Sequence, residues 1–95
     1  MSIETEPFDP AIYLDTPESQ AELLSDALET GDAGYIADAL GIIARARGMT
    51  GVAREAGVAR EALYKSLSAN GDPRLKTLLG VVKALGFRLT VQPVP

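Results

Sequence analysis

Helix start and stop signals divide most of this chain into short segments. Thr16-Pro17 and Asp72-Pro73 each place a capping side chain directly before a proline, which is a strong way to begin a helix. Glycine follows several of the apolar-periodic segments, as at Gly31 and Gly48, and stops them. We therefore expect an all-α domain of five short helices. They cover residues 17–29, 32–47, 50–56, 59–69 and 73–85.

The C-terminal residues follow a different pattern. Phe87, Leu89 and Val91 alternate with polar residues, which is the period of a β-strand, and Pro93 ends it. A lone strand leaves its backbone groups unpaired and needs a second strand, so we expect pairing across the two-fold axis of a homodimer. The chain thus divides into an extended arm at 1–15, a helical domain at 16–86 and a dimerisation strand at 87–95.

The composition narrows the possible functions. The chain has no cysteine and no histidine, so it lacks thiolate ligands, cysteine nucleophiles and the commonest general base. We expect a protein that is not an enzyme and that holds no metal and no cofactor. A secretory signal and an apolar stretch long enough to cross a bilayer are both missing, which predicts a cytoplasmic protein without a membrane partner.

The net charge of −4 is the sum of two unlike halves. Residues 1–44 hold ten acids and no lysine or arginine, whereas residues 45–95 hold nine bases against three acids. This asymmetry predicts two surfaces with different partners, the cationic one suited to nucleic acid. Glu18, Glu22 and Asp26 recur at every fourth residue, where like charges repel. That acidic ridge is either a solvated helix face or the binding surface for a basic protein.

Residues 50–69 have the features of a helix-turn-helix. Val52 and Ala56 face inward on the first helix, Gly57 occupies a turn that needs a positive φ, and Leu63 and Leu67 anchor the second helix. In this motif the N-terminal part of the second helix enters the major groove of double-stranded DNA. The candidate DNA-binding residues are Thr50, Gly51, Arg54, Arg60, Glu61, Tyr64, Lys65 and Ser68.

The same region resembles a known family, the addiction-module antidote proteins, which are HigA-like antitoxins with an Xre-type, lambda-repressor-like helix-turn-helix. The resemblance rests on the residues Ala44-Arg45-Ala46-Arg47-Gly48-Met49, Ala53-Arg54-Glu55-Ala56-Gly57-Val58 and Arg60-Glu61-Ala62-Leu63-Tyr64-Lys65-Ser66-Leu67, with Tyr13-Leu14, Pro17-Glu18 and Lys83-Ala84-Leu85-Gly86 outside them. It implies the antitoxin of a type II toxin–antitoxin module. Such a protein silences a RelE/HigB-like toxin and represses its own operon as a DNA-bound dimer on the bacterial nucleoid.

Two positions differ from the pattern of that family. Ala59 stands where a hydroxyl residue commonly caps the recognition helix, and Gly51 stands where a glutamine often reaches DNA. Two other functions remain open at this point. One is a stand-alone Xre-type transcriptional regulator, and the other is a helix-turn-helix module that binds a protein and no DNA.

Overall fold

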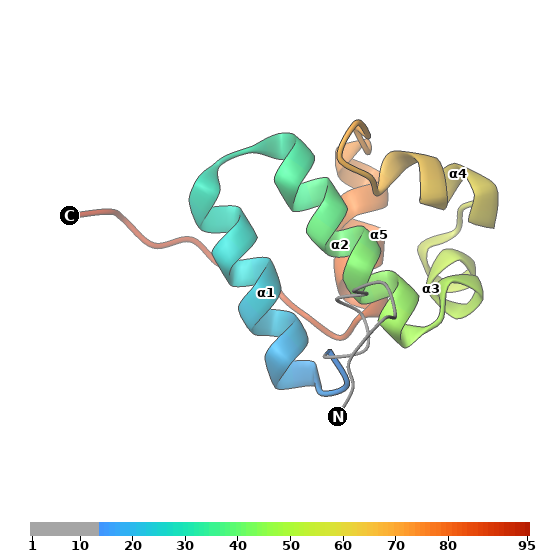
Figure 1. Ribbon diagram of the computed structural model, residues 1–95, viewed down its shortest axis with the longest axis horizontal. Coiled ribbons are helices and arrows are strands. Elements are labelled where there is room, and N and C mark those ends of the chain that lie inside the picture. The colour runs from blue at the N-terminus through green and yellow to red at the C-terminus, as the bar shows by residue number, and fades with distance from the viewer. Residues whose placement is uncertain (1–13) are drawn as a thin grey trace, which may run out of the picture.

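The computed structural model describes residues 14–95, and all regular structure in that part of the chain is helical (Figure 1). The all-α prediction with five helices is confirmed. The residues predicted as an arm lie largely outside the described part of the chain. The helices are α1 (Pro17–Thr30), α2 (Ala33–Arg47), α3 (Met49–Ala56), α4 (Arg60–Ser66) and α5 (Leu75–Ala84).

The first two helices begin where the sequence predicts, because each has a local cap. The Thr16 hydroxyl accepts a hydrogen bond from the Ser19 amide at 3.1 Å, and Pro17 occupies the first turn of α1. The Asp32 carboxylate caps α2 in the same way, accepting from the Tyr35 amide at 3.0 Å. Between them Gly31 has a φ of 69°, a left-handed conformation suited to glycine, so α1 and α2 form a tight helical hairpin.

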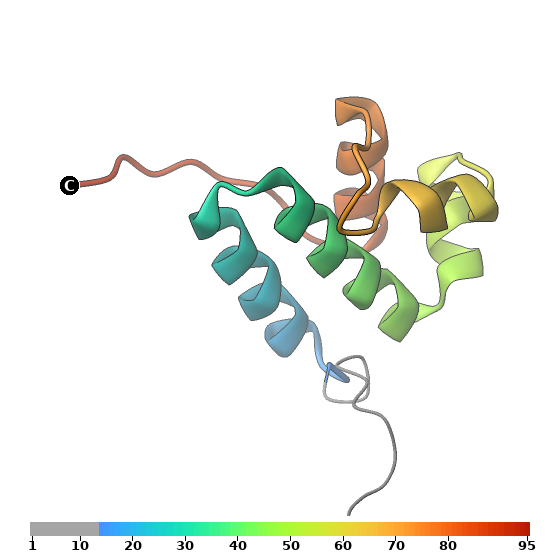
Figure 2. The ribbon, with the colours of Figure 1, turned by 45° about the horizontal axis from the view of Figure 1, so that its top comes forward.

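The other three helices form the opposite end of the molecule (Figures 1 and 2). Helix α3 contacts both α2 and α5, and α4 follows it after a sharp turn. None of the three has a side-chain hydrogen bond at its N-cap. They are held instead by the shared core, whose largest fully buried side chains are Leu40, Ile43, Leu63, Val81 and Leu85.

The predicted start of the fifth helix is wrong. Asp72-Pro73 is non-helical, and Arg74 at the N-cap of α5 is extended, with φ −62° and ψ 153°. The preceding loop is drawn tightly onto the end of α4, since the Gly71 amide donates to the Ser68 carbonyl at 2.8 Å and a side chain on Gly71 would meet the Ser66 carbonyl. This packing separates the end of α4 from the start of α5, and residues 71–74 have no regular structure.

The inner face of α5 and the length of α4 also differ from the prediction. The apolar spacing of residues 73–85 predicts an inner stripe of Leu75, Leu78, Leu79, Val82 and Leu85. Leu75 and Leu79 are nevertheless exposed, Leu75 by 69%. The buried face of α5 is formed by Val81, Val82 and the following Leu85, which turns the two leucines outward from α3. Helix α4 ends at Ser66 instead of residue 69, because the chain must turn there into the loop that leads to α5.

Residues 87–95 leave the helical body as an extended segment and, in the described chain, form no strand (Figure 1). Phe87 packs against the core, and its amide donates to the Val82 carbonyl at 3.0 Å. Residues 14–86 offer this segment no strand to pair with, and beyond the Phe87 amide its backbone has no hydrogen-bond partner among the described residues. The expected pairing across a dimer remains a prediction. None of the described helices is long and apolar enough to cross a membrane.

Candidate nucleic-acid interface

The turn between α3 and α4 has the geometry that the sequence predicts. Gly57 has a φ of 76°, and its amide donates to the Arg54 carbonyl at 3.2 Å. The Val58 amide then donates to the Ala53 carbonyl at 3.0 Å, and the Val58 side chain packs against the core. Buried Ala53 leaves room for the two helices to approach. The turn therefore fixes the direction of α4 relative to α3.

Helix α4 has one buried and one exposed face. Leu63 and Leu67, the latter directly after the helix, are buried in the core. Four of the predicted DNA-binding residues form the exposed face of α4, and three more are exposed on α3. Those on α4 are Arg60, Glu61, Tyr64 and Lys65, and those on α3 are Thr50, Gly51 and Arg54.

Ser68 does not belong to this face. It is half-buried beyond the end of α4, and its hydroxyl donates to the Lys65 carbonyl at 3.0 Å. The sequence predicts Ser68 on the exposed face because the fourth helix is expected to continue to residue 69. In the structure, Ser68 contributes to the turn that follows the helix.

Arg60 and Tyr64 form a pair that the sequence analysis treated as separate side chains. The guanidinium donates to the Tyr64 hydroxyl at 3.5 Å and lies 5.4 Å from the centroid of its ring. The hydrogen bond to Tyr64, together with the electrostatic interaction between the two side chains, raises the pKa of Arg60 above its usual value. The four-residue spacing on one helix face was the signal for this contact. The pair directs a permanent cation along the start of α4.

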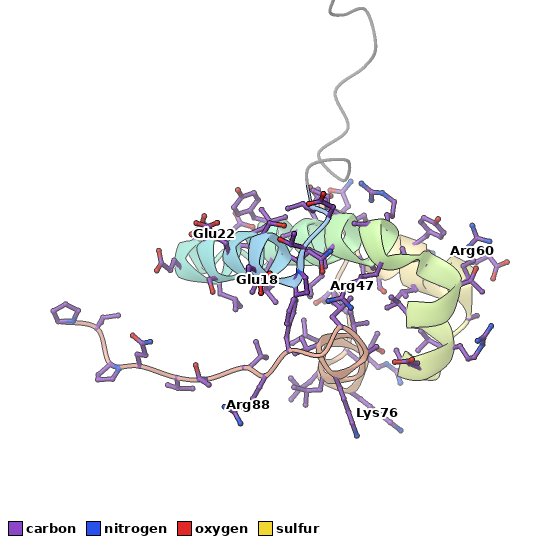
Figure 3. All side chains as sticks on the ribbon, turned by 90° about the horizontal axis from the view of Figure 1, so that it is seen from below. Glu18, Glu22, Arg47, Arg60, Lys76 and Arg88 are labelled. Carbon is purple, nitrogen blue, oxygen red and sulfur yellow. The ribbon has the colours of Figure 1, made fainter. Side chains whose placement is uncertain are left out.

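The acidic ridge lies far from this interface. Glu18, Glu22 and Asp26 are all exposed on α1, as predicted for a surface feature. Figure 3 labels the first two on α1 and Arg60 at the other end of the molecule. The acidic ridge and the exposed face of α4 are thus separate surfaces of the molecule.

Comparison with known proteins places the chain in a family. The model of a family described as probable addiction module antidote proteins matches residues 4–93. The chain belongs to this antidote family. It is also 41% identical over 92 residues to an uncharacterized protein of Haemophilus influenzae, and the aligned residues cover 97% of this chain and 95% of the relative. No solved structure matches it. An antidote acts on a toxin, so membership of the family implies a toxin partner.

The antidote chain contains one structural centre that sequence reasoning missed. Arg47 donates through Nε to the Gln20 side-chain oxygen at 2.7 Å and through a terminal nitrogen to the Leu85 carbonyl at 2.9 Å. Its guanidinium also lies 5.7 Å from the centroid of the Phe87 ring. Gln20, only 3% exposed, in turn donates to the Leu14 carbonyl at 2.8 Å. The signal was a glutamine on the inner face of α1, where a buried amide needs partners.

This centre changes the interpretation of two residues of the antidote. Arg47 lies in the last turn of α2, where the helix dipole favours a cation, but it also joins α1, α2 and the end of α5. Phe87 was assigned to the dimer interface, yet it packs on the core beside Arg47. Of the three predicted dimerisation residues, Leu89 and Val91 remain exposed. Among the described residues, no three acidic side chains gather as a metal site would require.

Proposed function

We propose that this antidote is the antitoxin of a type II module, an autorepressor that binds its operator DNA as a homodimer in the bacterial cytoplasm and neutralises a basic, RelE/HigB-like toxin. The observation that carries the proposal is the helix pair α3–α4, with its buried inner face and its exposed cations Arg54, Arg60 and Lys65. The HigA-like, Xre-type assignment rests on the sequence resemblance at the same residues.

The DNA-binding part of the proposal follows from the shape and charge of α4. A helix in the major groove needs a face free of core contacts, and Arg60, Glu61, Tyr64 and Lys65 lie on such a face. Arginine and lysine contact guanine edges or phosphates, and glutamate accepts from cytosine. In a dimer, two copies of α4 enter successive major grooves about 34 Å apart.

A binding titration with duplex DNA from the region upstream of its own gene tests this interface. We expect Arg60→Ala and Lys65→Ala each to weaken binding by about tenfold, the loss typical of one good base contact. Lys76→Ala is the matched control, since it removes an equal charge from α5, on the side of the molecule away from Arg60 in Figure 3. Equal affinities for all four proteins, or binding that does not depend on salt, would contradict the proposal.

The toxin-binding part rests on the charge of α1. Glu18, Glu22 and Asp26 are exposed on one helix, and residues 1–44 hold no base to neutralise them. Like charges four residues apart on a helix cost a few tenths of a kcal/mol per pair, which a cationic partner offsets. A small basic protein encoded beside this gene is therefore the expected ligand.

Co-purification with the product of the neighbouring gene tests this surface. We expect Glu22→Lys to weaken the complex and the triple reversal of Glu18, Glu22 and Asp26 to abolish it. Glu55→Lys on α3 is the control, because it makes the same charge change on another exposed helix. Retention of the toxin by the triple variant would identify the acidic ridge as an ordinary solvated face.

The homodimer is the third part of the proposal. Leu89 and Val91 are exposed on an extended segment, and Val91 is 96% exposed, which a dimer interface would relieve. Because Phe87 packs on the core, a truncation after Phe87 tests the segment without disturbing the fold. We expect light scattering to report a dimer for the full chain and a monomer for the chain that ends at Phe87. A truncated chain that stays dimeric would place the interface elsewhere.

A further inference from the structure

The C-terminal segment and α1 enclose a groove of about 570 Å³. Ala21, Leu28 and Glu29 line it on the side of α1, and Leu89 and Val94 line it on the side of the segment. Leu28 and Leu89 are both exposed, so the groove presents apolar surface to solvent on each wall. The segment crosses α1 (Figure 1), and in Figure 3 the Arg88 side chain points away from that helix.

The backbone along this groove has a defined stretch of free hydrogen-bonding groups. Upstream, the Phe87 amide is already bonded to the Val82 carbonyl. Downstream, Pro93 has no amide hydrogen to donate. Within the described residues, no backbone hydrogen bond joins residues 88–92 to any other part of the chain. These five residues therefore form the only length of the segment that another strand can pair with continuously.

We propose that residues 88–92 of a second copy occupy this groove, pairing antiparallel with residues 88–92 of the first about a two-fold axis at Thr90. The proposal rests on the proposed homodimer and specifies its register. Thr90 is the central residue of the free stretch, so a two-fold there uses all five residues of both copies. Leu89 then lies opposite the partner's Val91, on the same face of the ribbon.

Side-chain chemistry agrees with this register and disfavours an axis at Arg88 or between two residues. Leu89 and Val91 of both strands share one face only when odd-numbered residues lie opposite odd-numbered residues. In the proposed dimer this apolar face covers Leu28 on α1. An axis at Arg88 would place it opposite the partner's Arg88, and like charges directly opposite are destabilising. With the axis at Thr90, Arg88 lies opposite the partner's Gln92. Residues 88–92 are thus self-complementary about this axis, which favours a second copy of this chain as the partner.

Cysteine cross-linking of the full-length protein tests the register, because the chain has no cysteine of its own. Opposed residues of an antiparallel pair have Cα atoms about 4.5–5.5 Å apart, which a disulfide can bridge. We expect Thr90→Cys to form a covalent dimer under mild oxidation. Arg88→Cys and Gln92→Cys alone should not, since each lies about 13 Å from its own symmetry mate. An equimolar mixture of these two variants should cross-link.

The results separate the register from the dimer itself. Light scattering of the reduced variants reports the dimer without reference to the cross-link. A dimer in which Thr90→Cys cross-links no better than Arg88→Cys overturns the register and leaves the homodimer in place. A monomer overturns both.

A second pair of variants tests whether the paired strands contact α1. Leu28→Glu should raise the dissociation constant of the dimer by about tenfold, because it removes a leucine from the covered surface. Leu79→Glu is the matched control, an exposed leucine on α5 outside the groove. Equal effects of the two substitutions would show that the ribbon does not lie against α1.

Discussion

The two ends of this molecule are built by different means. Helices α1 and α2 have 14 and 15 residues, and each begins at a side-chain cap. Helices α3 and α4 have only 8 and 7 residues and no such cap. Short helices are marginal in isolation, so α3 and α4 depend on packing against the rest of the protein. The start of each helix in the α1–α2 hairpin is thus fixed by a local cap. Helices α3 and α4, which form the candidate interface, are fixed by their contacts with the rest of the protein.

Gly41 is the residue at which α2 packs closely against the end of α4. It is buried in the middle of α2, and a side chain there would meet the backbone carbonyl of Leu67, directly after α4. Glycine inside a helix costs about 1 kcal/mol relative to alanine, so its presence here has a packing reason. The close approach of α2 to the end of α4 holds α4 in place and so fixes the position of its exposed face, which includes Arg60.

The largest expected effect comes from filling that contact. Gly41→Ala should lower the free energy of unfolding by about 3 kcal/mol, because the methyl group collides with backbone that cannot easily move. Gly51→Ala is the control, since Gly51 is exposed on α3 with nothing within 4 Å of an added methyl group. It should raise stability by about 1 kcal/mol through helix propensity. Urea unfolding followed by circular dichroism measures both.

If Gly41→Ala were as stable as the parent protein, the support of α4 by α2 would be looser than the structure indicates. A loss of stability in Gly51→Ala would mean that α3 is not helical at that residue.

Breaking the centre at Arg47 should have a smaller effect. Arg47→Ala leaves the buried Gln20 oxygen without its donor and the Leu85 carbonyl without a side-chain partner. We expect a loss of about 2 kcal/mol, the usual cost of an unsatisfied buried polar group. Arg45→Ala, two residues away on the exposed side of α2, should change stability by less than about 0.5 kcal/mol. Similar losses for both variants would mean that Arg47 stabilises the protein only as a cation at the end of a helix and not through its hydrogen bonds.

The smallest effects concern the caps and go in opposite directions. Thr16→Ala should destabilise the protein by about 1 kcal/mol by removing the cap of α1. Ala59→Ser should stabilise it by about 0.5–1 kcal/mol, because Ala59 is the N-cap of α4 and has no side-chain bond to offer. Thermal melts of the two variants measure this contrast. A neutral Ala59→Ser would mean that packing already satisfies the start of α4.

The same contrast explains how much the sequence could predict. The starts of α1 and α2, the turn at Gly57 and the exposed residues of α4 follow from local rules, and all were predicted correctly. The start of α5 was wrong because Asp72-Pro73 matches a cap locally, whereas the contact of Gly71 with the end of α4 decides the backbone. Local patterns do not report which distant carbonyl a residue meets.

The contacts of Gln20 and Phe87 were missed for the same reason. Both are set by Arg47, which lies 27 residues after Gln20. No helical period connects residues at that distance in the chain. The contact of Arg60 with Tyr64, by contrast, is local, because residues four apart lie on the same face of one helix.

The centre at Arg47 also has a consequence for the dynamics of the chain. Leu14 at the beginning of the described chain and Leu85 before the C-terminal segment are both tied, directly or through Gln20, to a single guanidinium. Local opening tends to occur in contiguous cooperative units, and this side chain joins the residues before α1 and after α5 in one such unit. Amide exchange at Gln20 and Phe87 should therefore speed up together when Arg47 is replaced by alanine.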